Sequence, residues 1–231
     1  MNQPDSNNAL ITIWDVWTRL FHWSLAVAVI FLLVSGNTSF LFFEWHKAAG
    51  EFVLALLVFR LIWGIVGSSN VKLASLISHP GRAASHFRDL LKRDVSPTRG
   101  HNAAGGWAIV IMLILLLTQA GTGMLIADED ELVEGAFYGL LSSDASFFLY
   151  DIHHMNAELI MAFVIIHVAM IFVYWLYAKT NLILPMISGR MSWPSNKTLP
   201  SLFIQRWWIG LICLAGVLLV FGYYLGWSKY L

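Results

Sequence analysis

Five long apolar stretches constrain the fold of this chain more than any other feature. They cover Thr18–Gly36, His46–Gly67, Gly105–Ile126, Ile152–Tyr177 and Trp207–Gly226. Each can cross a hydrocarbon core of about 30 Å, which takes roughly 20 helical residues. The spans must be helical, because a backbone in lipid has to satisfy its own hydrogen bonds and the alternating pattern of a β-barrel is absent. The sequence therefore predicts an all-α integral membrane bundle of five transmembrane helices.

The composition agrees with a membrane protein. Hydrophobic residues make up 58% of the chain and charged residues 12%, whereas soluble domains have about 45–50% and about 25%. The single cysteine, Cys213, excludes an internal disulfide and the CxxCH motif that attaches haem covalently. The segment Met1–Asp15 has no basic start and no small-residue cleavage site. We therefore expect no cleaved signal peptide and a first span that stays as a signal anchor.

Charge is distributed unevenly among the loops. Basic residues are concentrated in Ser68–Ala104 and Ala178–Arg206. The loop Ala127–Asp151 has no Lys or Arg, and its acids are Asp128, Glu129, Asp130, Glu131, Glu134, Asp144 and Asp151. The positive-inside rule places the basic loops and the N-terminus in the cytoplasm, and the acidic loop and the C-terminus outside. Within the first basic loop, Ala83–Arg93 fits either a helix on the membrane surface or a solvated loop.

Ionisable residues inside a span are costly and mark function by default. Four histidines lie in the predicted spans at positions that can be compared: His22, His46, His153 and His167. A single one could be a buried histidine bonded to a carbonyl. His153 and His167, however, are 14 residues apart on one helix, so they share a face within about 40° and lie about 21 Å apart along the axis. The neighbouring His154 is rotated by roughly 140° from His167 and should not be a ligand.

The direction of each span places these histidines at two levels. His46 starts the second span outside, level with His153, which is expected to begin the fourth span. His22 lies one turn into the first span, level with His167. Paired imidazoles on facing helices of a bundle can bind a metal or a haem. No Cys, Asp or Glu completes a small-ion site, and four-coordinate zinc would need more ligands. Haem needs only two axial ligands, so the pairs predict two bis-histidine haems.

Glycines at both levels could give a haem room. Gly36 lies at the outer level, Gly105 and Gly106 lie at the inner level, and Gly121 and Gly123 lie about four turns outward from them. Small residues also promote close packing of membrane helices, which is the alternative explanation.

Two arginines are candidates for contact with haem propionates. Arg60 lies 14 residues after His46, on the same face and at the depth of the inner pair, and Arg19 lies one turn before His22. A guanidinium in a span needs an anion, and a propionate would serve. Alternatively, both arginines reach to lipid phosphates.

Several motifs together resemble the bacterial cytochrome b561 and nickel–iron hydrogenase cytochrome b group. They are WDVWTRLFHW from Trp14, HKAAG from His46, RLIWG from Arg60 and GHNAAGG from Gly100, followed by the spacing from His153 to His167. The similarity covers nearly everything from Trp14 to about Tyr177. The alanines 103–104 depart from it, because a turn containing proline is expected there.

The resemblance implies four haem-bearing helices, two haems b held by His22, His46, His153 and His167, and a bacterial inner-membrane location. It implies electron exchange between a quinone pool and a partner protein, such as a periplasmic c-type cytochrome or a hydrogenase. We divide the chain into a cytoplasmic segment 1–17, a four-helix di-haem domain 18–178, a basic loop 179–206 and a fifth helix 207–231. The fifth helix is typical of hydrogenase-type members, which favours a subunit over a stand-alone enzyme.

Two other functions compete with this one. Some four-helix relatives oxidise superoxide with quinone as acceptor, and a non-redox haem sensor is a third option. A sensor needs only one haem, whereas two stacked haems form a conduit. The acidic loop distinguishes electron transfer to a partner protein from superoxide oxidation, because its carboxylates would repel superoxide and attract a basic protein surface. The loop could also be simply solvated. Electron transfer to a basic partner is therefore the preferred hypothesis, with a superoxide:quinone oxidoreductase as the alternative.

Overall fold

The computed structural model describes residues 9–38, 42–95, 98, 100–128, 133–195 and 197–227. Within these ranges the protein is mostly helical, with five helices that are long and apolar enough to cross a membrane. They are α1 (Val16–Ser35), α2 (Phe43–Val66), α4 (Ala103–Gly123), α5 (Ser143–Phe172, continued by a π-helical segment Val173–Tyr177) and α7 (Trp207–Tyr224). The five predicted spans are confirmed as helices.

Lipid is the solvent that suits the surfaces of these helices. Val27 on α1, Ile65 on α2 and Leu219 on α7 are 69%, 68% and 74% exposed. Aliphatic side chains exposed to this extent along whole helices are stable in hydrocarbon and unfavourable in water. The chain is therefore a multi-pass membrane protein.

The fourth span starts earlier than predicted. The sequence placed its beginning at Ile152, whereas α5 begins at Ser143. The Ser142 hydroxyl accepts from the backbone N–H of Ala145 at 3.4 Å, and Asp144 lies in the first turn, where a carboxylate suits the helix dipole. His153 consequently lies ten residues inside α5, about 15 Å along its axis, and the prediction that it begins the helix is wrong.

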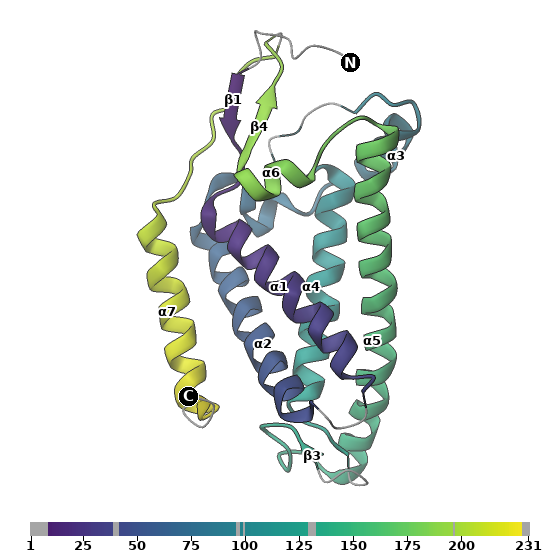
Figure 1. Cartoon of the computed structure of the whole chain (residues 1–231), viewed down its shortest axis with the longest axis vertical. Helices are drawn as coiled ribbons and strands as arrows, with labels where there is room; N and C mark the ends of the chain where they lie inside the picture. The colour runs from purple at the N-terminus through teal and green to yellow at the C-terminus, as the bar shows by residue number, and fades with distance from the viewer. Residues whose placement is uncertain are drawn as a thin grey trace. The chain divides into compact units, whose positions relative to one another are not determined.

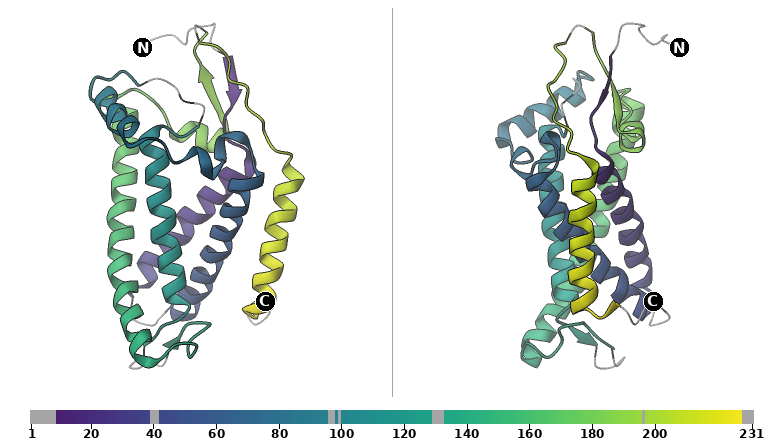
Figure 2. Two further views of the ribbon diagram at one scale, coloured as in Figure 1. Left: turned by 180° about the vertical axis from the view of Figure 1, so that it is seen from behind. Right: turned by 90° about the vertical axis from the view of Figure 1, so that its left-hand side faces the viewer.

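Contacts divide the chain into two compact units. The first unit contains residues 1–20, 62–110 and 167–210. Besides helix ends it holds two 3₁₀ turns (Ser69–Val71 and Leu73–Ser75), α3 (Pro80–Leu91) and α6 (Ile183–Ser188). The strands β1 (Ala9–Thr12) and β4 (Arg190–Trp193) pair antiparallel, with Ala9 opposite Trp193 (Figures 1 and 2). No pattern in the sequence predicted this ribbon.

Asp15 organises the start of α1 in this unit. Its carboxylate accepts from the backbone N–H of Thr18 at 2.8 Å, as an N-cap does. The Trp63 indole N–H lies 3.3 Å from each of its oxygens, and both side chains are buried. The Trp17 indole donates to the carbonyl of Trp207 at 2.6 Å, and the same ring covers Gly210, where a Cβ would collide with it. The first turns of α1 and α7 are thus packed against each other.

The amphipathic segment of the first basic loop is helical, as α3. Its position on the membrane surface stays a prediction. α3 packs against the π-helical end of α5 through two tyrosines. Tyr177 donates to the carbonyl of Leu91 at 2.7 Å, and the Arg93 guanidinium lies 4.3 Å from the centre of its ring. Tyr174 bonds to His86.

The second unit contains residues 21–61, 111–166 and 211–231. A short hairpin of β2 (Ala127–Asp128) and β3 (Val133–Glu134) joins α4 to α5. The amide of Asn156 on α5 donates to the carbonyl of Leu115 at 2.9 Å and to the Gln119 side chain at 2.7 Å, both on α4. These hydrogen bonds fix α5 against α4 in an environment without competing water. The acids Glu129, Asp130 and Glu131 lie outside the described residues.

Candidate metal centre

His46 and Ser35 meet where α1 is followed by α2 in the second unit. Ser35 is the last residue of α1, and His46 lies in the first turn of α2. The Ser35 Oγ lies 2.9 Å from His46 Nδ1, and it also donates weakly to the carbonyl of Leu32 at 3.4 Å. A Cβ at the next residue, Gly36, would lie 3.2 Å from His46 Cε1. The Nδ1 side of the ring is therefore held by the end of α1.

His153 has the same kind of environment on the other helix pair of this unit. Thr122 Oγ1, near the end of α4, lies 3.0 Å from His153 Nδ1. The hydroxyl also lies 2.8 Å from the carbonyl of Thr118 and 3.0 Å from that of Gln119. A Cβ at Gly123 would lie 2.9 Å from His153 Cε1, closer than real Cβ contacts come.

The two imidazoles belong to one unit. Each has its Nδ1 engaged by a hydroxyl, which leaves Nε2 as the nitrogen for a metal. Among the described residues, no group of three or more His, Cys, Asp or Glu side chains could hold an ion. A pair of neutral imidazoles suits a haem iron, because the macrocycle supplies the remaining four nitrogens.

The neighbour of His153 has a different environment. His154 is exposed, and its ring lies 4.4 Å from that of Tyr150, one turn earlier on α5. The two adjacent histidines therefore face different surroundings, as the helical period of 100° per residue requires. That His153 and not His154 is the ligand stays a prediction.

The other predicted pair is divided between the units. His22 lies on α1 in the second unit, half-buried and edge-on to Trp23 with ring centres 5.0 Å apart. His167 lies on α5 in the first unit, where it is exposed. Their pairing remains a prediction from spacing.

The two predicted arginines differ in burial. Arg60 on α2 is only 4% exposed, as expected for a guanidinium deep in a span. Arg19 is half-buried, and it donates to the carbonyl of Ile187 at 2.7 Å and, at 3.4 Å, to that of Asp15. Backbone acceptors therefore satisfy part of Arg19 without any propionate.

The predicted glycines Gly36, Gly106 and Gly121 also differ in their surroundings. Gly36 accommodates the ring of His46, and nothing lies within 4 Å of a Cβ at Gly121, which leaves space there. A Cβ at Gly106 would collide with the carbonyl of Leu76, so close backbone packing within the first unit explains this glycine by itself.

Sequence reasoning missed Glu51, which lies five residues after His46 in the apolar stretch. It is 1% exposed, and its Oε2 accepts from the Trp227 indole at 2.8 Å. The cost of burying an ionisable group in a span, which singled out the histidines, applies equally to this carboxylate and could have found it. Ser35 and Thr122 were missed as well, because a hydroxyl in an apolar helix carries no comparable signal.

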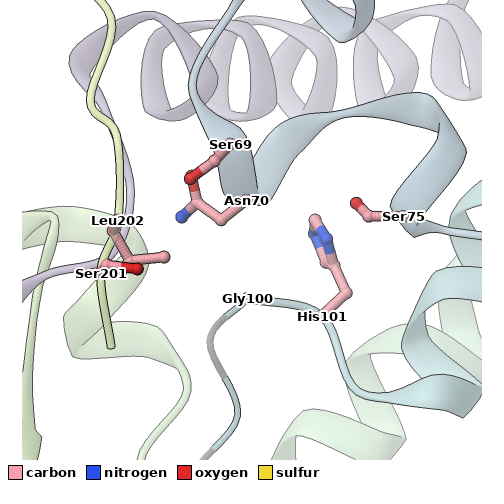
Figure 3. A pocket seen from close by; sticks show the side chains of 7 residues that line it. All are labelled: Ser69, Asn70, Ser75, Gly100, His101, Ser201 and Leu202. Atoms are coloured by element: carbon pink, nitrogen blue, oxygen red, sulfur yellow. The ribbon is translucent and has the colours of Figure 1, made fainter. Parts of the chain in front are cut away.

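A separate polar cavity of about 300 Å³ lies in the first unit. Figure 3 shows its lining of serines, Asn70, Gly100, His101 and Leu202. Asn70 is buried. The cavity belongs to a different unit from His46 and His153.

Comparison with known proteins gives a family match. The sequence profile described as prokaryotic cytochrome b561 matches residues 13–189. A probable Ni/Fe-hydrogenase B-type cytochrome subunit from Rhizobium leguminosarum bv. viciae is 22% identical over 211 residues, which cover 78% of this chain and 87% of the relative. Proteins of this kind bind b-type haem and transfer electrons in the membrane. The profile match extends over most of the chain, which therefore belongs to the prokaryotic cytochrome b561 family.

Proposed function

We propose that the protein is a di-haem b cytochrome that transfers electrons between membrane quinone and a redox partner protein. The observation that carries this proposal is the arrangement of His46 and His153, each with Nδ1 on a hydroxyl and Nε2 left for a metal. His46 and His153 would hold the haem through their Nε2 nitrogens, and the bound haem would supply one-electron chemistry. The protein's part is to hold the two imidazoles and exclude water.

The second haem of the proposal rests on the helical period. His22 and His167 are its ligands, because His167 shares a face of α5 with His153 at a distance of about 21 Å. Two haems at this spacing would carry electrons across most of the hydrocarbon core. Arg60 is the proposed partner of a propionate of this second haem, and its burial supports a role other than reaching to lipid phosphate.

The redox partner is proposed to dock beside the His46–His153 haem. Lys47, next to His46, donates to the carbonyl of Glu134 at 2.8 Å, so the end of the acidic loop lies beside this histidine. A periplasmic c-type cytochrome or a hydrogenase fits as the partner, since the relative from Rhizobium is named as a hydrogenase cytochrome subunit. The charge of the loops supports a bacterial inner membrane location with the N-terminus in the cytoplasm.

Haem content tests the proposal directly. A pyridine haemochrome assay on the purified full chain should give two haems b per protein, and the ferric protein should have the electron paramagnetic resonance spectrum of low-spin bis-histidine haem. One haem or none per chain would contradict the di-haem assignment. A high-spin spectrum would contradict bis-histidine ligation.

A further inference from the structure

Each of the two imidazoles of the second unit rests on the same two-residue combination, a hydroxyl residue followed by glycine. His46 contacts Ser35 and Gly36 at the end of α1, and His153 contacts Thr122 and Gly123 at the end of α4. In both cases the hydroxyl lies at hydrogen-bond distance from Nδ1 and the glycine lies against Cε1 of the same ring. We refer to these dipeptides as the two ring seats.

The hydroxyl proton decides which imidazole tautomer the Thr122 seat holds. A threonine hydroxyl has one proton to donate. Thr122 Oγ1 lies 2.8 Å and 3.0 Å from two backbone carbonyls, which can only accept. Its proton is therefore directed to a carbonyl, and its lone pair accepts from His153 Nδ1–H at 3.0 Å. The proton on Nδ1 leaves the lone pair of Nε2 available for iron.

Ser35 is arranged in the same way, but its hydrogen bond to the helix carbonyl is longer. The donation from Ser35 to the carbonyl of Leu32 is 3.4 Å long, and the contact with His46 Nδ1 is 2.9 Å. Ser35 and Thr122 are both buried, at 8% and 7% exposure. Both seats also lie at helix C-termini, where the free carbonyls carry partial negative charge.

Both glycines leave room for the close approach of the rings. An alanine Cβ would come within 2.9 Å of His153 Cε1 and 3.2 Å of His46 Cε1. Serine and threonine in helices often donate a hydrogen bond to a carbonyl three or four residues earlier. This habit explains the contacts between the hydroxyls and the helix carbonyls. It does not explain why a ring nitrogen and a glycine contact accompany the hydroxyl at both histidines.

We infer that Ser35–Gly36 and Thr122–Gly123 are positioning elements that fix the Nδ1–H tautomer and the ring orientation of His46 and His153, and thereby set the reduction potential of the haem between them. The inference rests on the proposed haem site. The chain from carbonyl to hydroxyl to Nδ1–H polarises the imidazole and raises its basicity towards iron. A more basic ligand stabilises the ferric state, so the two seats lower the potential of this haem.

The test compares Thr122→Val, which keeps the shape of the side chain and removes the hydroxyl, with the conservative Thr122→Ser and with Thr118→Val, an exposed position one turn earlier. Spectroelectrochemical titration should show that Thr122→Val raises the midpoint potential of one haem, with a change of threefold or more in its ferric–ferrous equilibrium constant. Thr122→Ser and Thr118→Val should keep the potentials of the unmodified protein. Ser35→Ala should raise the potential of the same haem by a smaller amount than Thr122→Val, because the hydrogen bond from Ser35 to the Leu32 carbonyl is longer.

Haem content separates failure of this inference from failure of the proposed function. Two bis-histidine haems with unchanged potentials and unchanged resonance g values in both Thr122→Val and Ser35→Ala would overturn the role of the seats and leave the di-haem proposal standing. Absence of bis-histidine haem from the unmodified protein would overturn both. If Thr122→Val does not accumulate in membranes, Ser35→Ala and Thr122→Ser decide: the inference requires a raised potential in the first and an unchanged one in the second.

Discussion

At the scale of single residues, two adjacent histidines on α5 have different surroundings. His153 lies against a hydroxyl and a glycine of α4, whereas His154 is exposed beside Tyr150. The rotation of 100° per residue in a helix accounts for this difference. When the ring of His153 faces α4, the next side chain, His154, points in another direction. The same residue type therefore has different expected roles at positions 153 and 154.

Removal of the imidazole at position 153 should abolish the binding of one haem. His153→Ala should lower the haem content of the purified protein from two to one, and His154→Ala should leave both haems, because only the first ring has its Nδ1 held by α4. The pyridine haemochrome assay measures both variants. Equal loss in the two variants, or loss only in His154→Ala, would contradict the assignment.

Alanine at the seat glycines should disturb the rings. Gly123→Ala should reduce retention of one haem and destabilise the protein by about 1–3 kcal/mol, the usual cost of overpacking. Gly36→Ala should have a smaller effect, because its contact with Cε1 is 3.2 Å rather than 2.9 Å. Haem content during thermal unfolding in detergent is the measurement. Gly50→Ala is the matched control, since nothing lies within 4 Å of a Cβ there, and an equal effect at all three positions would refute the argument.

Loss of the charge at position 60 should lower a haem potential. A buried cation favours the ferrous state, which carries one electron more, and low dielectric strengthens the effect. Arg60→Met should therefore lower the midpoint potential of one haem in spectroelectrochemical titration. Arg60→Lys keeps the positive charge, so the potential of that haem should stay close to that of the unmodified protein. Unchanged potentials in Arg60→Met would favour contact with lipid phosphate.

At the scale of elements, α3 and the π-helical end of α5 form one packed assembly in the first unit. His86 on α3 lies beside the phenol of Tyr174, and Asn102 donates to the same phenol oxygen at 3.1 Å. The Tyr174 hydroxyl and His86 Nε2 share a hydrogen bond whose direction depends on the tautomer of His86. Burial lowers the pKa of His86, and Asp89 nearby raises it to a smaller extent.

The docking of α3 should consequently weaken in acid. Because the pKa of His86 is lower in the folded protein than its ordinary value of about 6.5, the unfolded form takes up protons first, and stability falls as pH decreases through about 6.5. Hydrogen exchange of residues 80–91 should therefore accelerate, relative to its intrinsic rate, between pH 7.5 and pH 5. His86→Gln should lose this pH dependence. The same pH dependence in both proteins would assign it to a group other than His86.

At the scale of the whole molecule, charge is separated along the sequence while the formal net charge is zero. The acidic loop between α4 and α5 is the surface on which the proposal places a basic redox partner. A field of this sign speeds encounter with a cationic protein and hinders a small anion such as superoxide. Screening limits its range to a Debye length of about 10 Å at 0.1 M salt.

Neutralising the loop should slow electron transfer with a basic partner. The variant carries Asn or Gln at Asp128, Glu129, Asp130, Glu131 and Glu134. Stopped-flow reaction with a basic cytochrome c should become slower and less dependent on salt, because the attractive field is lost. The control Asp144→Asn/Asp151→Asn changes acids on α5 and should have a smaller effect. Unchanged cytochrome rates, together with rapid reaction of the unmodified protein with superoxide, would favour the superoxide:quinone oxidoreductase.

The sequence by itself determined the five spans and the spacing of the four histidines. Both are local properties, because the length of an apolar stretch and the helical period do not depend on the rest of the chain. It could not place the start of α5, since the capping at Ser142 and Asp144 extends that helix beyond the apolar stretch. Nor could it predict the β1–β4 ribbon, which joins residues about 180 positions apart.

Only the tertiary structure decided what each ring contacts. The bonds of Ser35 to His46 and Thr122 to His153, and the closeness of Gly36 and Gly123 to those rings, depend on how neighbouring helices are rotated and how near they approach. Gly106 shows the same dependence, because it packs on the carbonyl of Leu76, and spacing alone could not distinguish this from clearance for a haem. Contacts between helices are set by side-chain packing over the whole interface, which no single segment of sequence encodes.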